Sequence, residues 1–307
     1  RGAGGEPVDF ARTLLSHGVA DLPPNRIAPD GSRLETVLAT DAGSWAVELV
    51  SPAPGRAVLR APAGTPPPPA ARAQLLAQVR HMLRLDEDLG AFYAVAATDP
   101  ALAWVTAGAG RMLRSPTVFE DVVKTICTTN CAWSGTVRMV SALVAELGPA
   151  AEGSHEGSVR SADAPSPAPR RGFPTPVAMA TAGEDFYRDV ARAGYRGAYL
   201  RTLAAEVAEG RLDLEALDDP ELPDDTAAEL LLALPGVGPY ATAHVMMLLG
   251  RYRRLILDSW TRPTYRRLSG RPRVTDKGIE RAFRTYRQFA GLAFWMTLTQ
   301  SWVTEAG

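Results

Sequence analysis

The sequence predicts a mainly helical α+β fold, in which a small N-terminal antiparallel β unit precedes a helical body. Three observations predict it. Alternating apolar residues and turn residues prevail up to about residue 75, helical spacing prevails from Ala70 onward, and residues 231–260 have the pattern of two helices joined by a glycine-rich hairpin. We therefore divide the chain into a β-rich domain, residues 1–75, and a helical domain, residues 76–307.

The N-terminal unit is expected to contain short strands. Strands are predicted at Leu34–Thr40 and Trp45–Val50, with a turn at Asp41–Gly43 between them, and Ala57–Leu59 adds a third. The four prolines Pro66–Pro69 form neither a helix nor an inner strand, because proline has no backbone N–H and a fixed φ. We expect this run to be an extended linker between the two domains.

Helical spacing of apolar residues continues through most of the remaining chain. Glu152–Arg171 interrupts it, because this segment is rich in Ser, Pro, Gly and Ala and has too few bulky apolar residues to order itself, so we expect a mobile loop. The helices predicted outside the hairpin unit are Ala70–Leu83, a helix ending near Ala94, a helical pair within Phe119–Leu147, Pro176–Ala182, Glu184–Ala193, Tyr199–Glu209, Lys277–Tyr286 and Ala290–Val303.

The hairpin unit begins with a helix that carries its own start signal. Thr226 followed by Glu229 matches a capping box. In this motif the Thr226 side chain accepts from the backbone N–H of Glu229, and the Glu229 side chain accepts from the backbone N–H of Thr226. The apolar run after Glu229 continues the helix until Pro235 ends it.

The turn that follows is suited to binding an anion. Gly236 and Gly238 supply positive-φ backbone without side chains, and Pro239 suits the first turn of the second helix. Bare amides at a helix N-terminus bind a phosphate without help from side chains. The hairpin therefore predicts a site for a nucleic-acid backbone.

A lone acid follows the second helix. Asp258 comes directly after the apolar run Leu255–Leu257, so we expect its carboxylate to lie against packed apolar groups. Two interpretations remain open at this point. Asp258 is either the N-cap of the helix that begins near Ser259, a common role of Asp, or a catalytic carboxylate.

Composition sets limits on the class of protein. The chain has 307 residues, 46% of them hydrophobic and 22% charged, and a formal net charge of −1, as is usual for a globular protein. Arg251–Arg287 nevertheless contains twelve Arg or Lys and three acids, which indicates either a phosphate-binding face or a solvated surface. No apolar run is long enough to span a bilayer.

The chain contains two cysteines, Cys127 and Cys131, four residues apart on one predicted helix face. This count favours a reduced cytoplasmic protein with buried thiols, and it rules out a cluster that needs four cysteines. No histidine or further cysteine lies at ligand spacing, so no metal site is predicted.

Together, the hairpin and Asp258 resemble the helix-hairpin-helix (HhH-GPD) superfamily of DNA glycosylases. Ile126–Asn130, Gly194–Arg196 and Phe289–Gly291 are similar to segments of 8-oxoguanine DNA glycosylase and of the 3-methyladenine DNA glycosylase II group. The resemblance implies that Asp258 is catalytic and that DNA is contacted by Asn130, Tyr195, Arg196, Leu234, Gly236, Val237, Gly238 and Tyr240.

Three of these residues have implied roles in base flipping. By resemblance, Asn130 contacts the base left behind, Tyr195 is an aromatic wedge and Arg196 is its neighbouring donor. An extruded base leaves a gap that an aromatic plane and polar donors can fill. The alternative is structural: Tyr195 packs at a helix start and Asn130 bonds backbone.

Departures from the family pattern concern the base and the lyase step. Members that also cut the backbone carry a Lys at the position of Tyr240, and a phenol cannot form an imine. By the same resemblance, the thiol of the 8-oxoguanine pocket falls at His244, and the pocket's Gln and Phe fall at Phe294 and Leu298. An Arg that reads the orphan cytosine falls at Gly135. What remains is an aromatic set, which favours cationic alkylated purines by stacking and cation–π attraction. The predicted base pocket contains Trp133, Tyr240, His244, Trp260, Phe294 and Trp295.

These residues predict a monofunctional DNA N-glycosylase of base excision repair that acts on a damaged, alkylated purine. The alternatives are a mismatch or oxidised-base glycosylase and a non-catalytic lesion-binding protein. No cofactor is required, although the resemblance allows a structural monovalent cation at the hairpin. We expect a monomer that binds double-stranded DNA. We expect it in the cytoplasm, associated with the nucleoid and not with a membrane.

Overall fold

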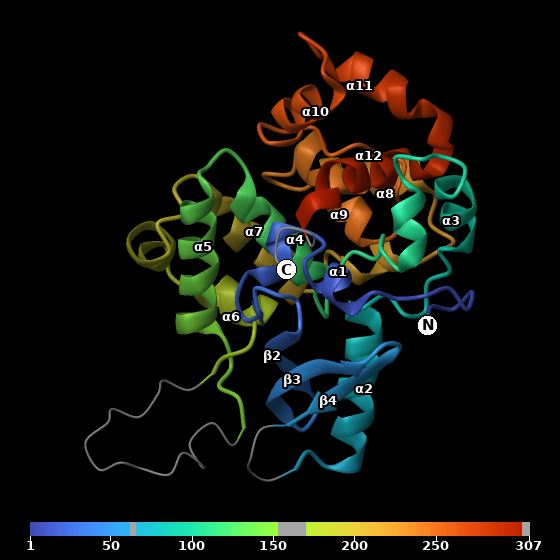
Figure 1. The fold of residues 1–307 in the computed structure, drawn as a ribbon. Coiled ribbons are helices and arrows are strands. Elements are labelled where there is room, and N and C mark those ends of the chain that lie inside the picture. Colours follow the sequence, from blue (N-terminus) through green and yellow to red (C-terminus); the bar gives the residue numbers. More distant parts are fainter. Residues whose placement is uncertain (62–65, 153–169, 303–307) are drawn as a thin grey trace.

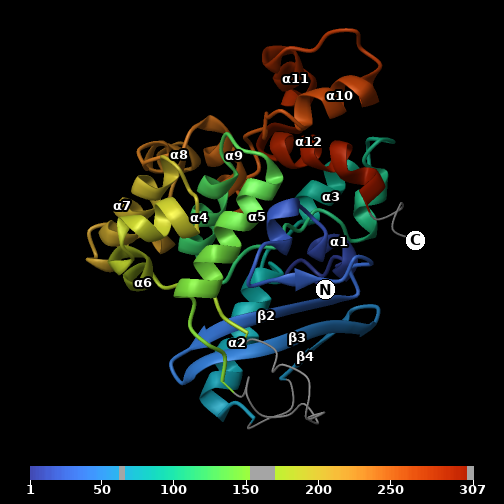
Figure 2. The same cartoon turned by 90° about the vertical axis from the view of Figure 1, so that its left-hand side faces the viewer.

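The computed structural model describes residues 1–61, 66–152 and 170–302. A small β-sheet lies at one end of the molecule and a larger helical body covers the rest (Figures 1 and 2). The predicted fold class is therefore confirmed. In the described part of the chain, no helix is long and apolar enough to cross a membrane.

The sheet has four antiparallel strands in chain order: β1 (Arg26–Ile27), β2 (Arg33–Thr40), β3 (Gly43–Ala53) and β4 (Arg56–Arg60). Thr40 pairs with Gly43 across a two-residue turn, and the φ of Gly43 is 119°, which favours glycine. Alternate residues of β3 point into the core, as the period of a strand requires. The predicted strands and their turn are confirmed.

Helix α2 (Pro69–Met82) packs on the sheet and crosses residue 75, where we expected the domain boundary. Leu75, Val79 and Met82 share a core with the buried residues of β2 and β3. Pro69 opens this helix, so the linker prediction was wrong at its last proline, whose missing N–H costs little in a first turn. The N-terminal segment adds α1 (Phe10–Leu14) and the 3₁₀ turn η1 (Gly18–Asp21).

The helical body follows the predicted order, although several bounds differ. Cys131 lies beyond the end of α4 and not on its face, so the expected position of that thiol was wrong. The elements are α3 (Gly90–Ala96), η2 (Ala103–Ala107), α4 (Val118–Thr128), α5 (Trp133–Ala142), η3 (Leu143–Leu147), α6 (Pro176–Thr181), η4 (Phe186–Val190), α7 (Arg196–Ala208), η5 (Glu215–Asp218), α8 (Asp224–Leu232), α9 (Pro239–Leu248), α10 (Thr261–Ser269), α11 (Asp276–Phe283), η6 (Arg284–Phe289), α12 (Ala290–Thr299) and η7 (Gln300–Trp302).

Most of the segment expected to be a mobile loop, residues 153–169, lies outside the described residues, as does Val303. Hydrogen bonds hold the two ends of that segment in place. The N–H of Glu152 donates to the carbonyl of Ser44 at the start of β3, and Ala150 bridges to Arg171.

Helix α9 lies at the centre of the helical body. Val245 and Met246 pack in one core, with α4, α5, α7 and α8, whereas Met247 and Leu248 pack in another, with α3 and α10–α12. A helix that is apolar on all sides is buried on all sides, and α9 is almost entirely buried from Ala241 to Leu248. The hairpin therefore leads directly into a helix buried between the two cores of the helical body.

Candidate active site

The hairpin joins α8 and α9 through residues 233–238. Leu234 and Val237 point their side chains into the core, so only their backbone can face a ligand. Gly236 has a φ of 80°, and a Cβ there would lie 2.7 Å from the ring of Tyr199. Glycine is thus required at position 236 both by conformation and by packing.

Two details of the predicted hairpin were wrong. Helix α8 begins at Asp224, two residues before Thr226, so Thr226 lies inside the first turn and caps nothing. Gly238 has a φ of −104°, in the extended region, and a Cβ would meet nothing there. Pro223 directly precedes α8. Pro239 lies in the first turn of α9, as predicted.

The hairpin presents unpaired backbone donors. In the described chain, no acceptor is found for the backbone N–H groups of Gly236, Gly238 or Tyr240. These amides lie at the N-terminus of a ten-residue helix, where the helix dipole adds positive potential. The local geometry is that of an anion site.

Asp258 lies at the start of α10, after a connection in which Ile256 is buried in the core. Its Oδ1 accepts the backbone N–H groups of Trp260, at 2.8 Å, and Thr261, at 2.6 Å. The Thr261 hydroxyl in turn accepts the Asp258 N–H at 2.8 Å. Asp258 therefore caps the helix, as one interpretation predicted. Its second oxygen has no partner among the described residues and is free for other chemistry.

Tyr240 connects the hairpin to this carboxylate. Its phenol shares a hydrogen bond of 3.2 Å with the hydroxyl of Thr128, at the end of α4. Burial raises the pKa of Tyr240, and the negative charge of Asp258 raises it further, so the phenol stays protonated. The charge of Asp258 therefore acts on Tyr240, and the protonated phenol can donate a hydrogen bond.

Three tryptophans form an aromatic cluster beside Asp258. The ring of Trp260 lies 5.7 Å from that of Trp295 and 5.4 Å from that of Trp302. Trp260 remains 39% exposed, so a face of the cluster is open to a ligand. Trp302 was not predicted, because a single aromatic residue near the C-terminal end of a helical segment carries no distinguishing signal.

Phe294 was wrongly placed in the base pocket. Its side chain is fully buried and packs against Tyr265 and Phe283 in the core, at ring distances of 5.9 and 5.1 Å. Successive residues of a helix point about 100° apart, so Phe294 and Trp295 have different neighbours. Trp295 is also buried in this core, but its ring contacts that of Trp260.

The N-terminal segment brings an unpredicted histidine to His244. The rings of His17 and His244 lie 5.5 Å apart, edge to face, and His244 lies 6.1 Å from Tyr240. Both imidazoles are buried, and neither Nδ1 of His17 nor Nε2 of His244 has a partner in the described chain. Ser16 fixes this segment, because its carbonyl accepts the indole N–H of Trp295 at 2.8 Å.

Stability should fall in mild acid because of this histidine pair. Burial lowers the pKa of His17 from 6.5 to about 3, and that of His244 to about 4. The unfolded chain therefore takes up protons first, so their contribution is complete above pH 6.5 and is lost as pH falls toward 4. At pH 5 each histidine should reduce the free energy of unfolding by about 2 kcal/mol.

Urea unfolding at pH 7 and pH 5 measures this effect. His244→Gln should remove about 2 kcal/mol of the pH dependence, because glutamine does not titrate. A variant with the full pH dependence of the wild type would contradict the assignment.

The predicted wedge, Tyr195, lies directly before α7. Tyr195 is 52% exposed, and its hydroxyl accepts from the Asn130 side chain at 3.2 Å. Its ring also packs edge to face on Tyr199, the residue that covers Gly236. Asn130 has a φ of 47°, which holds its side chain out at the end of α4. Asn130, Tyr195 and the hairpin thus form one continuous surface.

Arg196 differs from its expected role as an open donor. Its side chain is buried, its guanidinium lies 4.6 Å from the centre of the Tyr195 ring, and its Nε donates to the carbonyl of Thr129 at 2.9 Å. Arg196 therefore holds the Asn130 loop against the Tyr195 ring in the free protein. Trp133 is 49% exposed at the start of α5, and its ring borders Gly18, next to His17.

Among the described residues, no group of three or more His, Cys, Asp and Glu side chains could hold a metal ion. The candidate site combines the carboxylate of Asp258, the protonated phenol of Tyr240, the neutral imidazoles of His17 and His244, and the tryptophan cluster around Trp260. The hairpin with its free backbone amides adjoins it.

The fold is similar to that of solved DNA glycosylases, as the sequence resemblance predicted. The chain is similar to a solved 3-methyladenine DNA glycosylase from Archaeoglobus fulgidus, with a TM-score of 0.72 and 18% identity, over 96% of each chain. It is also similar to the 8-oxoguanine glycosylase/lyase of Clostridium acetobutylicum in complex with double-stranded DNA, with a TM-score of 0.71 and 20% identity, over 96% of this chain and 92% of that one. No protein-family model matches the sequence. A search of curated proteins finds no match.

Proposed function

We propose that the protein is a monofunctional DNA N-glycosylase that removes an alkylated purine from duplex DNA. The observation that carries this proposal is the position of Asp258, with one oxygen tied to a helix start and the other free beside an aromatic cluster and the hairpin. A non-catalytic binding protein gains nothing from such a carboxylate near DNA phosphates, which it repels.

The hairpin and the wedge would hold and open the duplex. The free amides of Gly236, Gly238 and Tyr240 bind a phosphate of one strand. Tyr195 then enters the base stack, while Asn130 supplies polar contacts to the base that stays behind. The damaged nucleotide rotates toward Trp260 and Tyr240.

Asp258 would supply the chemistry. Cleavage of the N-glycosidic bond develops positive charge on the deoxyribose, in an oxocarbenium-like transition state. The free oxygen of Asp258 stabilises that charge and orients the attacking water, because Oδ1 is already saturated by two backbone amides. A fixed charge in a site sheltered from water contributes several kcal/mol. No cofactor takes part in this reaction, and a monomer is sufficient for it.

Substrate preference would follow from the lining. The open face of the Trp260 cluster attracts a base that alkylation has made cationic. One observation favours a second candidate, an oxidised or mismatched base. The unpartnered nitrogens of His17 and His244 could bond the edge of a neutral base, since a neutral imidazole carries one donor and one acceptor.

Single-turnover base release from duplexes with one lesion each separates these candidates. The panel contains an alkylated purine, hypoxanthine, 8-oxoguanine, uracil and a G:T mismatch. We expect fastest release of the alkylated purine. Release of 8-oxoguanine or of mismatched thymine instead would favour the second candidate, and salt-sensitive binding without release from any duplex would favour a lesion-binding protein.

After base release, strands should remain intact until alkali is added. A lyase step needs an amine near the sugar, and the chain has two lysines. Lys124 is buried in an ion pair with Glu120, at 2.7 Å, and Lys277 is exposed on α11, while position 240 holds a phenol. Borohydride should therefore trap no covalent complex. A trapped complex that disappears in Lys277→Gln would overturn the monofunctional assignment.

A further inference from the structure

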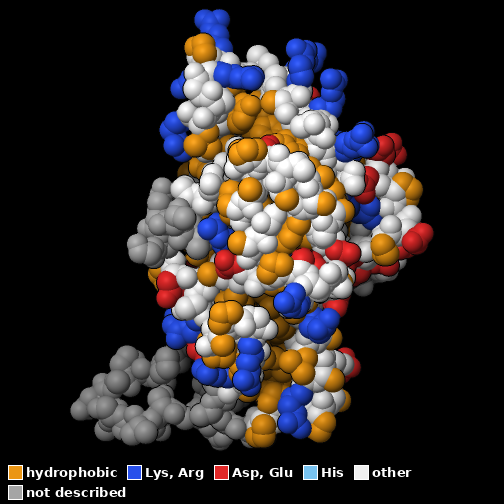
Figure 3. All heavy atoms as spheres, turned by 45° about the vertical axis from the view of Figure 1, so that its right-hand side comes forward, with side chains coloured by type: hydrophobic (Ala, Val, Ile, Leu, Met, Phe, Trp, Pro, Cys, Tyr) orange, Lys and Arg blue, Asp and Glu red, His pale blue; other side chains and the backbone are white. Residues whose placement is uncertain are grey.

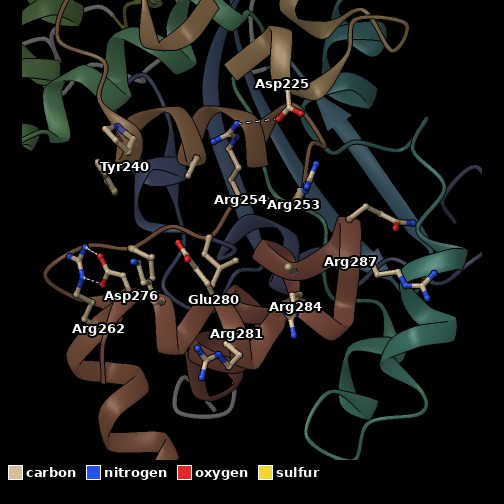
Figure 4. A pocket seen from close by; sticks show the side chains of 17 residues that line it. Asp225, Tyr240, Arg253, Arg254, Arg262, Asp276, Glu280, Arg281, Arg284 and Arg287 are labelled. Carbon is tan, nitrogen blue, oxygen red and sulfur yellow. Dashed lines mark hydrogen bonds and ion pairs between the residues drawn. The ribbon is translucent and has the colours of Figure 1, made fainter. Parts of the chain in front are cut away.

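A basic cleft of about 1040 Å³ opens beside the candidate active site. One wall is the connection between α9 and α10, and the other is formed by α11 and η6 (Figure 4). Tyr240 and Arg262 lie at one end of the cleft, and Arg287 lies at the other. The cleft also includes Pro239, at the start of α9, and Leu257, the neighbour of Asp258.

Most cations of this cleft have no acid partner. Arg254 pairs with Asp225 at 3.3 Å, and Arg262 forms a two-pronged pair with Asp276, at 2.7 and 2.9 Å. In the described chain, no ion pair is found for the other five cations that line the cleft, which are Arg253, Lys277, Arg281, Arg284 and Arg287. Glu280 is the one lining acid left unpaired.

This imbalance favours an anionic ligand. Five unpaired cations against one acid repel one another in the free protein, and the walls of a cleft focus their field. Guanidinium groups bind phosphate oxygens through parallel N–H donors. Figure 3 shows Lys and Arg side chains gathered at the end of the molecule that carries α10 and α11.

The cleft is continuous with the hairpin. Pro239 and Tyr240 belong both to the cleft lining and to the first turn of α9, where the free amides lie. A backbone whose phosphate sits on those amides therefore reaches the cleft through adjacent residues. A free nucleotide or phosphate would use the same chemistry but not this continuity.

We propose that the cleft binds the phosphodiester backbone of the duplex held by the hairpin, and so extends the DNA interface beyond the flipped nucleotide. This inference rests on the proposed function, because it takes DNA as the ligand of the hairpin. Each cation that contacts a phosphate releases counterions on binding, which makes affinity depend on salt.

The test compares two double variants by fluorescence anisotropy with a labelled duplex at several salt concentrations. Arg281→Gln/Arg284→Gln removes two exposed, unpaired cations of the cleft. Arg56→Gln/Arg72→Gln removes two exposed arginines of β4 and α2, at the opposite end of the molecule, for which no ion pair is found among the described residues. The cleft variant should show a salt slope shallower by about 2, roughly 1 for each residue, whereas the control should match the wild type.

The outcomes separate this inference from the proposed function. An unchanged slope in the cleft variant, with base release by the wild type intact, would overturn the cleft assignment alone. A slope that becomes equally shallow in the control variant would also overturn it, because the effect would then be one of net charge. A wild type that binds no duplex at any salt concentration would overturn the proposed function itself.

Discussion

Asp258→Asn should lower the single-turnover rate of base release by about 10² to 10³ fold or more, while DNA affinity stays the same or improves. Asparagine keeps the oxygen that accepts the N–H groups of Trp260 and Thr261, and it is a good helix cap. The substitution therefore removes the negative charge and leaves the start of α10 in place. The rate is measured on the best duplex of the panel, with protein in excess.

A matched control is Asp86→Asn, which removes an exposed acid outside the cleft and breaks a surface pair with Arg80. Surface pairs contribute little, so this variant should retain both stability and base release. If Asp258→Asn releases base at the wild-type rate, the carboxylate serves only as a cap, and the catalytic interpretation fails.

Gly291→Ala should destabilise the protein by about 3 kcal/mol and abolish base release in what remains folded. Gly291 is the second residue of α12, and its N–H donates to the carbonyl of Tyr252 at 2.7 Å. A Cβ at this position would lie 2.8 Å from that same oxygen and from the carbonyl carbon of Arg254, and closer still to the Arg254 oxygen. Helix α12 would have to move away from the connection that leads to Asp258.

Urea unfolding measures the loss, with Gly135→Ala as the control. Gly135 is also helical, but a Cβ there would meet Cys131 at an ordinary 3.7 Å, so alanine should be neutral or slightly stabilising. A Gly291→Ala variant as stable as the wild type would mean that the two backbones separate easily.

Local signals explain what could be predicted. The strands of the N-terminal sheet and the turn at Gly43 follow from alternation and a positive φ, which involve neighbours in sequence. The hairpin follows from Pro235 and Pro239, whose φ is fixed, and from Gly236, which tolerates a positive φ. The positions of Asp258 and Tyr240 relative to that hairpin depend on one helix and one short connection, so spacing was enough to select them.

Long-range packing explains what was missed or misplaced. Ser16 and Trp295 are 279 residues apart, yet their contact brings His17 to His244, and no pattern along the chain links them. Phe294 and Trp295 are neighbours with equal claims in sequence, and both are buried in the same core. Only the placement of α12 decides that Phe294 contacts Tyr265 and Phe283, whereas Trp295 contacts Trp260.

The fold class, the glycine-rich hairpin and the acid that follows it were predictable from the chain alone, because they depend on backbone preferences and short spacings. Three features emerged only from the packing of distant segments: the side chains around the acid, the burial of Arg196 under Tyr195, and the gathering of arginines from separate segments in one cleft. Those features depend on which faces of which helices pack together. Apolar burial drives this packing, and because it is non-directional, no pattern along the chain identifies the partners.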